Sequence, residues 1–308
     1  MDIALVGIGK IALDQHVPAL AASADWDLAA TVSRAGTVEG IPAYSDFDQM
    51  LADHPEIRVI SLCLPPVPRF DYAARALAAG RHVMLEKPPG ATLSECVELE
   101  RMARARGLSL YATWHSREAD KVAPAKAWLA DKTLRSLHVT WREDVRRWHP
   151  GQDWIFEAGG LGVFDPGINA LSIVTEILPQ PIHLTGADLL FPENRQAPIA
   201  AELAFFHPGG AKVTCDFDFR QEGEQTWSIE ATCDEGTLLL AHGGAQMFVD
   251  GVPQGSTQAG LSGEYPRLYA RMAQLVRAGG VDMDMAPMRH VADAFLLGAR
   301  EATDPFFF

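Results

Sequence analysis

The chain has few basic residues for its length. Its 308 residues include 26 Lys and Arg against 40 Asp and Glu, which gives a formal net charge of −14. No segment of the sequence concentrates Lys and Arg. Because a surface this acidic repels a phosphate backbone and an anionic bilayer, we expect neither nucleic acid nor a membrane as a partner.

Cysteines and long apolar runs are also scarce. Cys63, Cys96, Cys215 and Cys233 are scattered, and no two have the spacing of a metal site or a redox motif. We therefore expect free thiols and no metal site. No apolar run is long enough to span a bilayer, and the first residues lack the basic segment of a signal peptide. These features predict a cytoplasmic protein.

The beginning of the chain carries a glycine pattern. The apolar run Ile3–Val6 is typical of a buried strand, and Gly7, Gly9 and Ala12 follow it with the spacing G-x-G-x-x-A. The first glycine permits a tight turn, the second lets the backbone approach a pyrophosphate, and the small third residue lets a helix pack closely. Pro18 is expected to break or redirect that helix. The predicted dinucleotide contacts in this turn are Gly7, Ile8, Gly9, Lys10 and Ile11.

Strand and helix patterns alternate up to about residue 118. This rhythm predicts an α/β Rossmann domain over residues 1–118, with a doubly wound parallel sheet. Ligands bind at the carboxyl ends of such strands. Those ends carry Ser33, Arg34, Leu64, Pro65, Pro66, Glu86, Lys87, Pro88 and His115. We expect all of these except His115 to contact the cofactor.

The rhythm changes after residue 118. Six strand-like runs follow one another between residues 134 and 244. We predict an α+β domain over 119–285 with a large, mostly antiparallel open sheet. A C-terminal helix, about 286–308, can pack back on the first domain. Helical patterns lie at 121–131, 167–178, 263–280 and 288–302.

The end of the second strand bears on the choice of dinucleotide. NAD sites place an acidic residue here, where it accepts from the ribose 2′-hydroxyl. This chain has Ser33 and Arg34 instead, and no acidic residue before Glu39. A guanidinium and a hydroxyl suit a 2′-phosphate, which favours NADP over NAD. The alternative is that Arg34 is an ordinary solvated surface side chain.

Four motifs, in their order and spacing, resemble those of one family. The motifs are "GIGKIA" at 7–12, "CLPP" at 63–66, "EKPPGATLSE" at 86–95 and "GGLGVFDPGINALS" at 159–172. They resemble the glucose–fructose oxidoreductase, inositol dehydrogenase and rhizopine-catabolism family, written Gfo/Idh/MocA. The resemblance covers essentially the whole chain. "WHS" at 114–116, "EDVRRWHPGQDWI" at 143–155 and "DPGIN" at 165–169 most resemble its L-arabinose and D-galactose 1-dehydrogenase branch.

This resemblance implies an activity and a mode of assembly. The branch oxidises the anomeric hydroxyl of L-arabinose, D-galactose or a close relative to a lactone with NAD(P). The resemblance also implies that the domain over 119–285 binds the substrate and builds a homo-oligomer, a dimer or tetramer, through its sheet. It further implies a cis peptide before Pro88. Two alternatives stay open. One is a family enzyme for another polyol, of inositol or dihydrodiol type, and the other is a sensor that binds NADP and sugar without turnover.

The proton of the reacting hydroxyl needs a base, and two residues are candidates. Lys87 ends a strand at the cofactor edge, where burial and a nicotinamide cation would depress its pKa. His149 has an ordinary pKa that suits proton transfer near neutrality. Many family members have a His where this chain has Asn169, and Asn cannot take a proton. We favour Lys87 as the base, with His149 as the alternative.

The segment "DPGIN" carries the remaining catalytic candidates. Asp is a preferred N-cap and Pro166 suits a first helical turn, so Asp165 is expected to cap the following helix. A spacing of four also places Asp165 and Asn169 on one helix face, where they can hold sugar hydroxyls. The resemblance implies further sugar contacts from His115, Glu143, Trp148, His149, Asp153 and Trp154. For the two tryptophans, packing in the core is the alternative.

Overall fold

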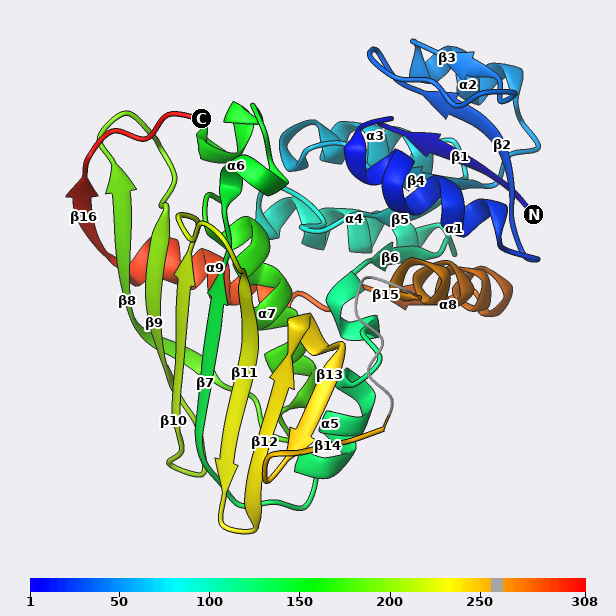
Figure 1. Cartoon of the computed structure of the whole chain (residues 1–308). Coiled ribbons are helices and arrows are strands. Elements are labelled where there is room, and N and C mark those ends of the chain that lie inside the picture. Colours follow the sequence, from blue (N-terminus) through cyan, green and yellow to red (C-terminus); the bar gives the residue numbers. More distant parts are fainter. Residues whose placement is uncertain (256–262) are drawn as a thin grey trace. The chain divides into compact units, whose positions relative to one another are not determined.

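The computed structural model describes residues 1–255 and 263–308, and in these the chain forms two compact units, each with one sheet (Figure 1). Unit 1 comprises Met1–His115 and Tyr265–Asp284. Unit 2 comprises Ser116–Glu264 and Met285–Phe308. Within the described residues, no helix has the length and apolarity to cross a bilayer. The four cysteines are thiols and not disulfides, as predicted; three are buried and Cys63 is half-buried.

Unit 1 is built on a parallel sheet of seven described strands, in the order β15–β6–β5–β4–β1–β2–β3. The strands are β1 (Asp2–Val6), β2 (Asp27–Val32), β3 (Ala43–Tyr44), β4 (Val59–Leu62), β5 (His82–Leu85), β6 (Leu110–Ala112) and β15 (Val281–Asp282). The central strands are buried along their whole length. Burial on both faces is what a doubly wound parallel sheet requires.

Helices cover both faces of this sheet. Ala4 and Val6 of β1 belong to the core beneath α2 (Phe47–Asp53), α3 (Pro66–Ala78) and α4 (Leu93–Ala105). Ile3 belongs to the core on the opposite face, beneath α1 (Val17–Ala21) and α8 (Glu264–Ala278). The alternation along β1 follows from the two-residue period of a strand. The predicted doubly wound α/β domain is confirmed.

Unit 2 is built on a mixed sheet of nine described strands, in the order β14–β13–β12–β11–β7–β10–β9–β8–β16. The strands are β7 (Leu134–Arg142), β8 (His183–Pro192), β9 (Ala200–Phe206), β10 (Lys212–Asp218), β11 (Thr226–Cys233), β12 (Gly236–Ala241), β13 (Gln246–Val249), β14 (Val252–Pro253) and β16 (Ala299–Thr303). The pairs β7–β10 and β8–β16 are parallel, and the other neighbours are antiparallel. The predicted large, mostly antiparallel sheet is confirmed.

Helices cover one face of this second sheet. The long helices are α5 (Val122–Leu129), α7 (Phe164–Ile177) and α9 (Ala286–Leu297), and the short ones are η2 (His115–Glu118), α6 (Val145–Trp148), η3 (Asp153–Phe156) and η4 (His242–Gly244). Gly167 allows α7 to approach the sheet, because a Cβ there would lie 2.7 Å from the ring of Phe217 on β10. The beginning of α7, with Asp165 and Asn169, is therefore held against the sheet.

The C-terminal region differs from the prediction in two respects. Of the two helices near the end of the chain, α8 belongs to unit 1. The predicted helix over about 286–308 lies in residues 285–308, which belong to unit 2. The reason is that the face of α8 completes the core of the parallel sheet with Tyr265 and Tyr269, both fully buried. The predicted helix over 288–302 is wrong at its end. Gly298 takes an extended conformation, and residues 299–303 pair with β8 as β16.

Candidate active site

The structure brings the predicted cofactor residues to one edge of the unit 1 sheet. Gly7–Ile11 follow β1, Ser33 and Arg34 follow β2, Leu64–Pro66 follow β4, and Glu86–Pro88 follow β5. These four strands are neighbours in the order β5–β4–β1–β2. Because all four run parallel, their carboxyl ends meet at the same edge. His115 follows β6, the next strand along.

The turn after β1 fits a dinucleotide. Gly7 has a φ of 90°, and a Cβ there would lie 3.0 Å from the backbone N of Leu64, so only glycine suits this bend. Gly9 is exposed, and a Cβ there would meet no protein atom within 4 Å. The bare backbone at Gly9 therefore leaves the space that a pyrophosphate occupies in such turns. Ala12 is fully buried, as the third position of the pattern requires.

The loop after β2 lies against this turn. Ser33 Oγ accepts from the backbone N of Ala35 at 3.2 Å and of Gly36 at 3.1 Å, which folds the loop into a tight turn. A Cβ at Gly36 would lie 2.4 Å from the carbonyl oxygen of Ile8. The loop is thus held beside Gly7 and Gly9, and the side chain of Arg34 is exposed next to it.

Glu86 has a buried carboxylate that is fully engaged inside unit 1. The residue is 5% exposed. Its Oε1 accepts from Tyr265 Oη at 2.8 Å and lies 3.2 Å from Nε2 of His16. Its Oε2 accepts from the backbone N of Lys87 at 2.7 Å. One carboxylate therefore joins the first helix, helix α8 and the turn that carries Lys87.

His16 extends this polar network. It ends a π turn, η1 (Ala12–His16), in which Val17 N donates to the carbonyl of Ala12, and its ring is 1% exposed. His16 Nδ1 lies 2.7 Å from Tyr269 Oη, which lies 3.3 Å from Ser61 Oγ. The π turn precedes Pro18, which lacks the N–H of a regular helical turn. The chain stays helical through Pro18, since η1 runs directly into α1, so the predicted break is absent and a π turn with the buried His16 precedes the proline.

The two charged partners stabilise each other. Burial lowers the pKa of His16, but its neighbours Cys63, Tyr269 and Glu86 outweigh burial and hold this pKa well above 6.5. Burial raises the pKa of Glu86, but the hydrogen bond from His16 and the charges of His16, His115 and Lys87 outweigh burial and bring this pKa below its ordinary 4.5. We therefore assign a buried imidazolium–carboxylate pair at neutral pH.

Arg69 holds the same turn from the other side. Its guanidinium is 2% exposed and donates to the carbonyl oxygens of Leu64, Glu86 and Pro88. The Lys87–Pro88 peptide is cis, as the family resemblance implies. Lys87 itself is half-buried. Its backbone is therefore fixed by a carboxylate on its N–H and by a guanidinium on the carbonyls that flank it.

In unit 2, Asp165 lies beside His149. The expectation that Asp165 caps its helix is wrong, because α7 begins at Phe164 with Val163 in the N-cap position. Asp165 lies in the first turn instead, where a carboxylate suits the helix dipole, and it is 4% exposed. Its Oδ2 lies 3.4 Å from His149 Nε2. Asn169, one turn further along the same face, is half-buried.

The other predicted sugar-binding residues of unit 2 have structural partners. Glu143 is 6% exposed, and its Oε2 accepts from Trp227 Nε1 at 2.9 Å. The ring of Trp148 lies 5.6 Å from that of Trp227. Asp153 accepts from Arg195 Nη1 at 2.6 Å. Trp154 is half-buried, and its carbonyl oxygen would lie 2.3 Å from a Cβ at position 160, which explains Gly160.

Several residues of these networks were missed at the level of the sequence. His16 gave no distinct local signal, because the polar residues Asp14 and Gln15 directly precede it. Arg69 lies on a predicted helix, but its three carbonyl partners come from two separate loops. Tyr265 and Trp227 gave no local signal, because their partners Glu86 and Glu143 are distant in sequence.

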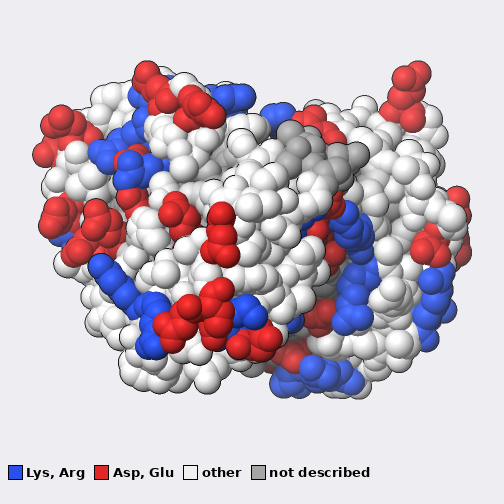
Figure 2. All heavy atoms as spheres, turned by 60° about the horizontal axis from the view of Figure 1, so that its bottom comes forward, with Lys and Arg blue, Asp and Glu red and all other residues white. Residues whose placement is uncertain are grey.

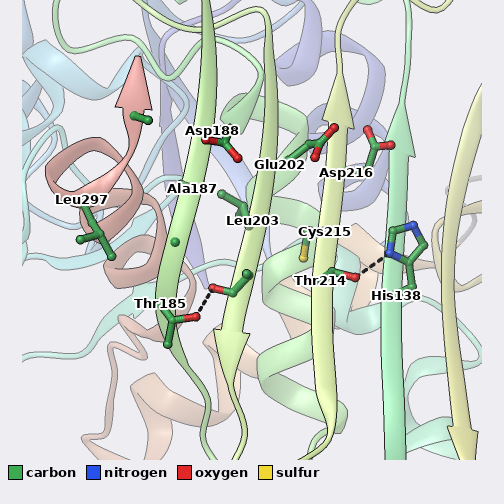
Figure 3. Close-up of a pocket in the computed structure, with 13 residues that line it drawn as sticks. His138, Thr185, Ala187, Asp188, Glu202, Leu203, Thr214, Cys215, Asp216 and Leu297 are labelled. Carbon is green, nitrogen blue, oxygen red and sulfur yellow. Dashed lines mark hydrogen bonds between the residues drawn. The ribbon is translucent and has the colours of Figure 1, made fainter. Parts of the chain in front are cut away.

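The face of the unit 2 sheet that the long helices leave uncovered carries a row of carboxylates (Figure 3). Asp188, Glu202 and Asp216 lie on neighbouring strands, with Asp188 opposite Glu202 and Glu202 opposite Asp216. Arg142 Nε donates to Asp216 at 3.1 Å. The row borders a hollow of about 520 Å³ that also includes His138 and Thr214. Like charges opposite each other weaken strand pairing, and here Arg142 offsets the charge of Asp216.

Comparison with known proteins places the chain in a family. The pattern described as "Oxidoreductase family, NAD-binding Rossmann fold", for GFO_IDH_MocA, matches residues 1–113. The chain is 42% identical over 306 residues to a galactose 1-dehydrogenase from Pseudomonas fluorescens, covering 99% of this chain and 98% of that protein. The chain belongs to the Gfo/Idh/MocA oxidoreductase family.

Solved structures of the Gfo/Idh/MocA fold agree with this assignment. The crystal structure of a D-galactose-1-dehydrogenase protein from Rhizobium etli has 54% sequence identity and a TM-score of 0.94, covering 99% of this chain and 97% of that one. A 3-ketoreductase from Actinomadura kijaniata, solved with TDP-benzene and NADP, has 19% identity and a TM-score of 0.84 over 98% and 99% of the two chains. The second likeness supports the fold alone.

The surface charges and the possible metal ligands of this family member bear on what it can bind. On the face of the molecule shown in Figure 2, Lys and Arg side chains are interleaved with Asp and Glu. Among residues 1–255 and 263–308, no group of three or more His, Cys, Asp and Glu side chains could hold a metal ion.

The buried pair predicts a pH-dependent loss of stability when His16 is replaced. In His16→Asn, Glu86 keeps Tyr265 but loses its cation, and we expect the free energy of unfolding to fall by about 3 kcal/mol. The raised pKa of His16 makes its contribution complete below pH 6.5 and lost as the pH rises through the folded-state pKa. The lowered pKa of Glu86 makes its contribution complete above pH 4.5.

The difference between wild type and His16→Asn should therefore be largest between pH 4.5 and 6.5 and shrink at higher pH. Urea unfolding at a series of pH values measures it. His183→Asn, at an exposed histidine of β8, is the control and should change little. A difference that grew with rising pH would contradict the assigned pair.

Proposed function

We propose that the chain is an NAD(P)-dependent aldose 1-dehydrogenase. It oxidises the anomeric hydroxyl of D-galactose, L-arabinose or a close relative to the corresponding lactone, with NADP as the preferred acceptor. The observation that carries the proposal is the near full-length likeness to two galactose 1-dehydrogenases, at 42% and 54% identity. The dinucleotide turn at Gly7 and Gly9 and the fixed turn at Lys87 support it.

The reaction divides into a hydride step and a proton step. A dinucleotide held by the turn at Gly7 and Gly9 would supply a nicotinamide that can take the hydride from C1 of the sugar. Lys87 Nζ takes the proton of the C1 hydroxyl, and its backbone is held for this task by Glu86 and Arg69. Fixing the base in advance lowers the entropic cost of reaching the reactive geometry.

The residues of unit 2 bind the sugar in this proposal. Asp165 and His149 are paired at 3.4 Å and offer a carboxylate and an imidazole to ring hydroxyls. Asn169 adds an amide on the same helix face and takes no part in proton transfer. Glu143, Trp148, Asp153 and Trp154 complete the sugar contacts, and His115 adds one from unit 1. His149 is the alternative base.

The preference for NADP rests on the loop after β2. The side chain of Arg34 is exposed beside the dinucleotide turn, because Gly36 holds the loop against Ile8. A guanidinium there attracts a 2′-phosphate, and the loop lacks the carboxylate that would accept from a 2′-hydroxyl.

The enzyme also forms a homo-oligomer in this proposal. A second copy covers the carboxylate row on the unit 2 sheet and supplies a cation from Lys212, which is exposed and in phase with Asp216 on β10.

A panel of aldoses tests the activity directly. Purified protein with NADP should reduce the nicotinamide with D-galactose and L-arabinose, which is measured by absorbance, and should act more slowly on D-glucose. With an inositol or a dihydrodiol as the only active substrate, the chain would be a different dehydrogenase of the same family. NADP binding without turnover of any compound in the panel would make it a sensor.

The cofactor preference is tested with Arg34→Ala. The substitution removes a charge-assisted hydrogen bond, so the KM for NADP should rise about tenfold or more, while the KM for NAD changes about twofold or less. Steady-state kinetics with both dinucleotides measures this. Arg58→Ala, at another arginine of unit 1, is the control. Equal effects of Arg34→Ala on the two dinucleotides would contradict NADP preference.

The assignment of the base is tested with Lys87→Met. General-base catalysis contributes about 10²–10⁴ to the rate, so kcat should fall by at least about 100-fold while NADP binding, measured by fluorescence titration, is retained. Lys126→Met, at an exposed lysine of α5, is the control and should keep full activity. A rate near that of wild type in Lys87→Met, with a large loss in His149→Asn, would move the role to His149.

A further inference from the structure

The last residues of the chain lie against the segment 145–156, which carries four of the proposed sugar-binding residues. Both belong to unit 2. In Figure 1 the red end of the chain passes beside α6. Phe306 is 6% exposed, whereas its neighbour Phe307 is 67% exposed. Within the tail, residues 304–308, Phe306 is thus the most buried phenylalanine, and the Phe308 ring, 37% exposed, lies 6.2 Å from that of Phe156.

Phe306 is part of an aromatic cluster that leads to His149. Its ring centroid lies 5.4 Å from that of Phe156, the last residue of η3. Phe156 lies 6.1 Å from Phe219, which is fully buried, and Phe219 lies 6.0 Å from His149. These edge-to-face and tilted contacts are the preferred arrangements of aromatic rings. The tail therefore packs on the same rings that pack on His149.

Two arginines join the tail to both ends of the same segment. Arg146 of α6 donates to the carbonyl of Phe307 at 2.9 Å, and its guanidinium lies 4.5 Å from the Phe306 ring. Arg195 donates from Nε to the carbonyl of Phe306 at 3.1 Å and from Nη1 to Asp153 at 2.6 Å. A guanidinium over an aromatic face is attracted to it. One contact thus holds α6 and the other holds η3.

The backbone of Phe306 is fixed as well. Its N donates to Asn194 Oδ1 at 2.8 Å, and its carbonyl accepts from Asn194 Nδ2 at 2.9 Å. Asn194 and Arg195 follow β8 directly. The tail is therefore attached to the sheet on one side and to the segment 145–156 on the other.

The segment 145–156 has little regular structure to hold it in place. Its helices α6 and η3 each have four residues. Helices this short are not stable by themselves, because the cost of the first turn exceeds the gain from so few hydrogen bonds. Between them, Gly151 has a φ of 67°. The conformation of the segment therefore depends on contacts with the rest of unit 2.

We propose that residues 304–308 are a positioning element for sugar binding. The tail fixes the segment 145–156 through Phe306, and so sets the place of Trp148, His149, Asp153 and Trp154. The functional part of this inference rests on the proposed aldose 1-dehydrogenase activity. The structural part, that the tail orders the segment, stands on the contacts within unit 2.

The kinetic test compares adjacent positions of the tail. In Phe306→Ala the KM for D-galactose should rise about tenfold, because the sugar must order a loosened segment, while the KM for NADP, whose predicted residues lie in unit 1, should stay within about twofold. Phe307→Ala is the matched control and should resemble wild type, since its side chain is exposed and its carbonyl remains. Phe306→Leu keeps apolar bulk and should recover most of the loss.

Hydrogen exchange tests the structural part without any substrate. Amides of residues 145–156 should exchange about tenfold faster in Phe306→Ala than in Phe307→Ala, with the amides of the unit 1 sheet unchanged. If wild type turned over no aldose, the proposed function would fail, and this measurement would still decide whether the tail orders the segment. Equal exchange and equal KM for the sugar in the two variants would overturn the inference. A parallel rise in both Michaelis constants with general loss of protection would also overturn it.

Discussion

The buried carboxylate of Glu86 is the constraint on which unit 1 depends. An ionised group away from water is tolerated only when partners replace its hydration, and Glu86 obtains them from His16, Tyr265 and the backbone of Lys87. Those partners come from the first helix, from α8 and from the end of β5. A single charge therefore fixes three elements at once, and with them the turn that presents Lys87 at the cofactor edge.

This arrangement explains why unit 1 is discontinuous in sequence. Helix α8 supplies Tyr265 to Glu86 and Tyr269 to His16, and both tyrosines are also part of the apolar core beneath the sheet. Without α8, that face of the sheet would lose its core, and the carboxylate would lose its hydroxyl donor. The polar network and the hydrophobic core are thus built from the same residues, so the geometry of the Lys87 turn is tied to the stability of the unit.

In unit 2, the candidate sugar-binding side chains are held in place by packing. Its sugar-binding candidates lie partly on a long helix, α7, and partly on a segment with two very short helices. Asp165 is fixed because Gly167 lets α7 lie close to Phe217. His149 is fixed by its contact with Phe219 and by the aromatic and arginine contacts that surround Phe156. Rigid helix packing and side-chain clustering therefore contribute separately to one set of side chains.

The sequence by itself determined the elements whose signal is local. Apolar runs, the glycine turn at Gly7 and Gly9, and the alternation of strand and helix predicted both sheets and the cofactor edge, because period and turn chemistry depend on neighbouring residues. The family resemblance added the prediction of a cis peptide before Pro88. It also supported Lys87, Asp165 and Asn169 as candidate catalytic residues. The tertiary structure alone decided which unit holds α8, that residues 299–303 form a strand, and that Asp165 pairs with His149 instead of capping its helix. Those outcomes depend on contacts between residues far apart in the chain, and such contacts leave no periodic pattern in the sequence.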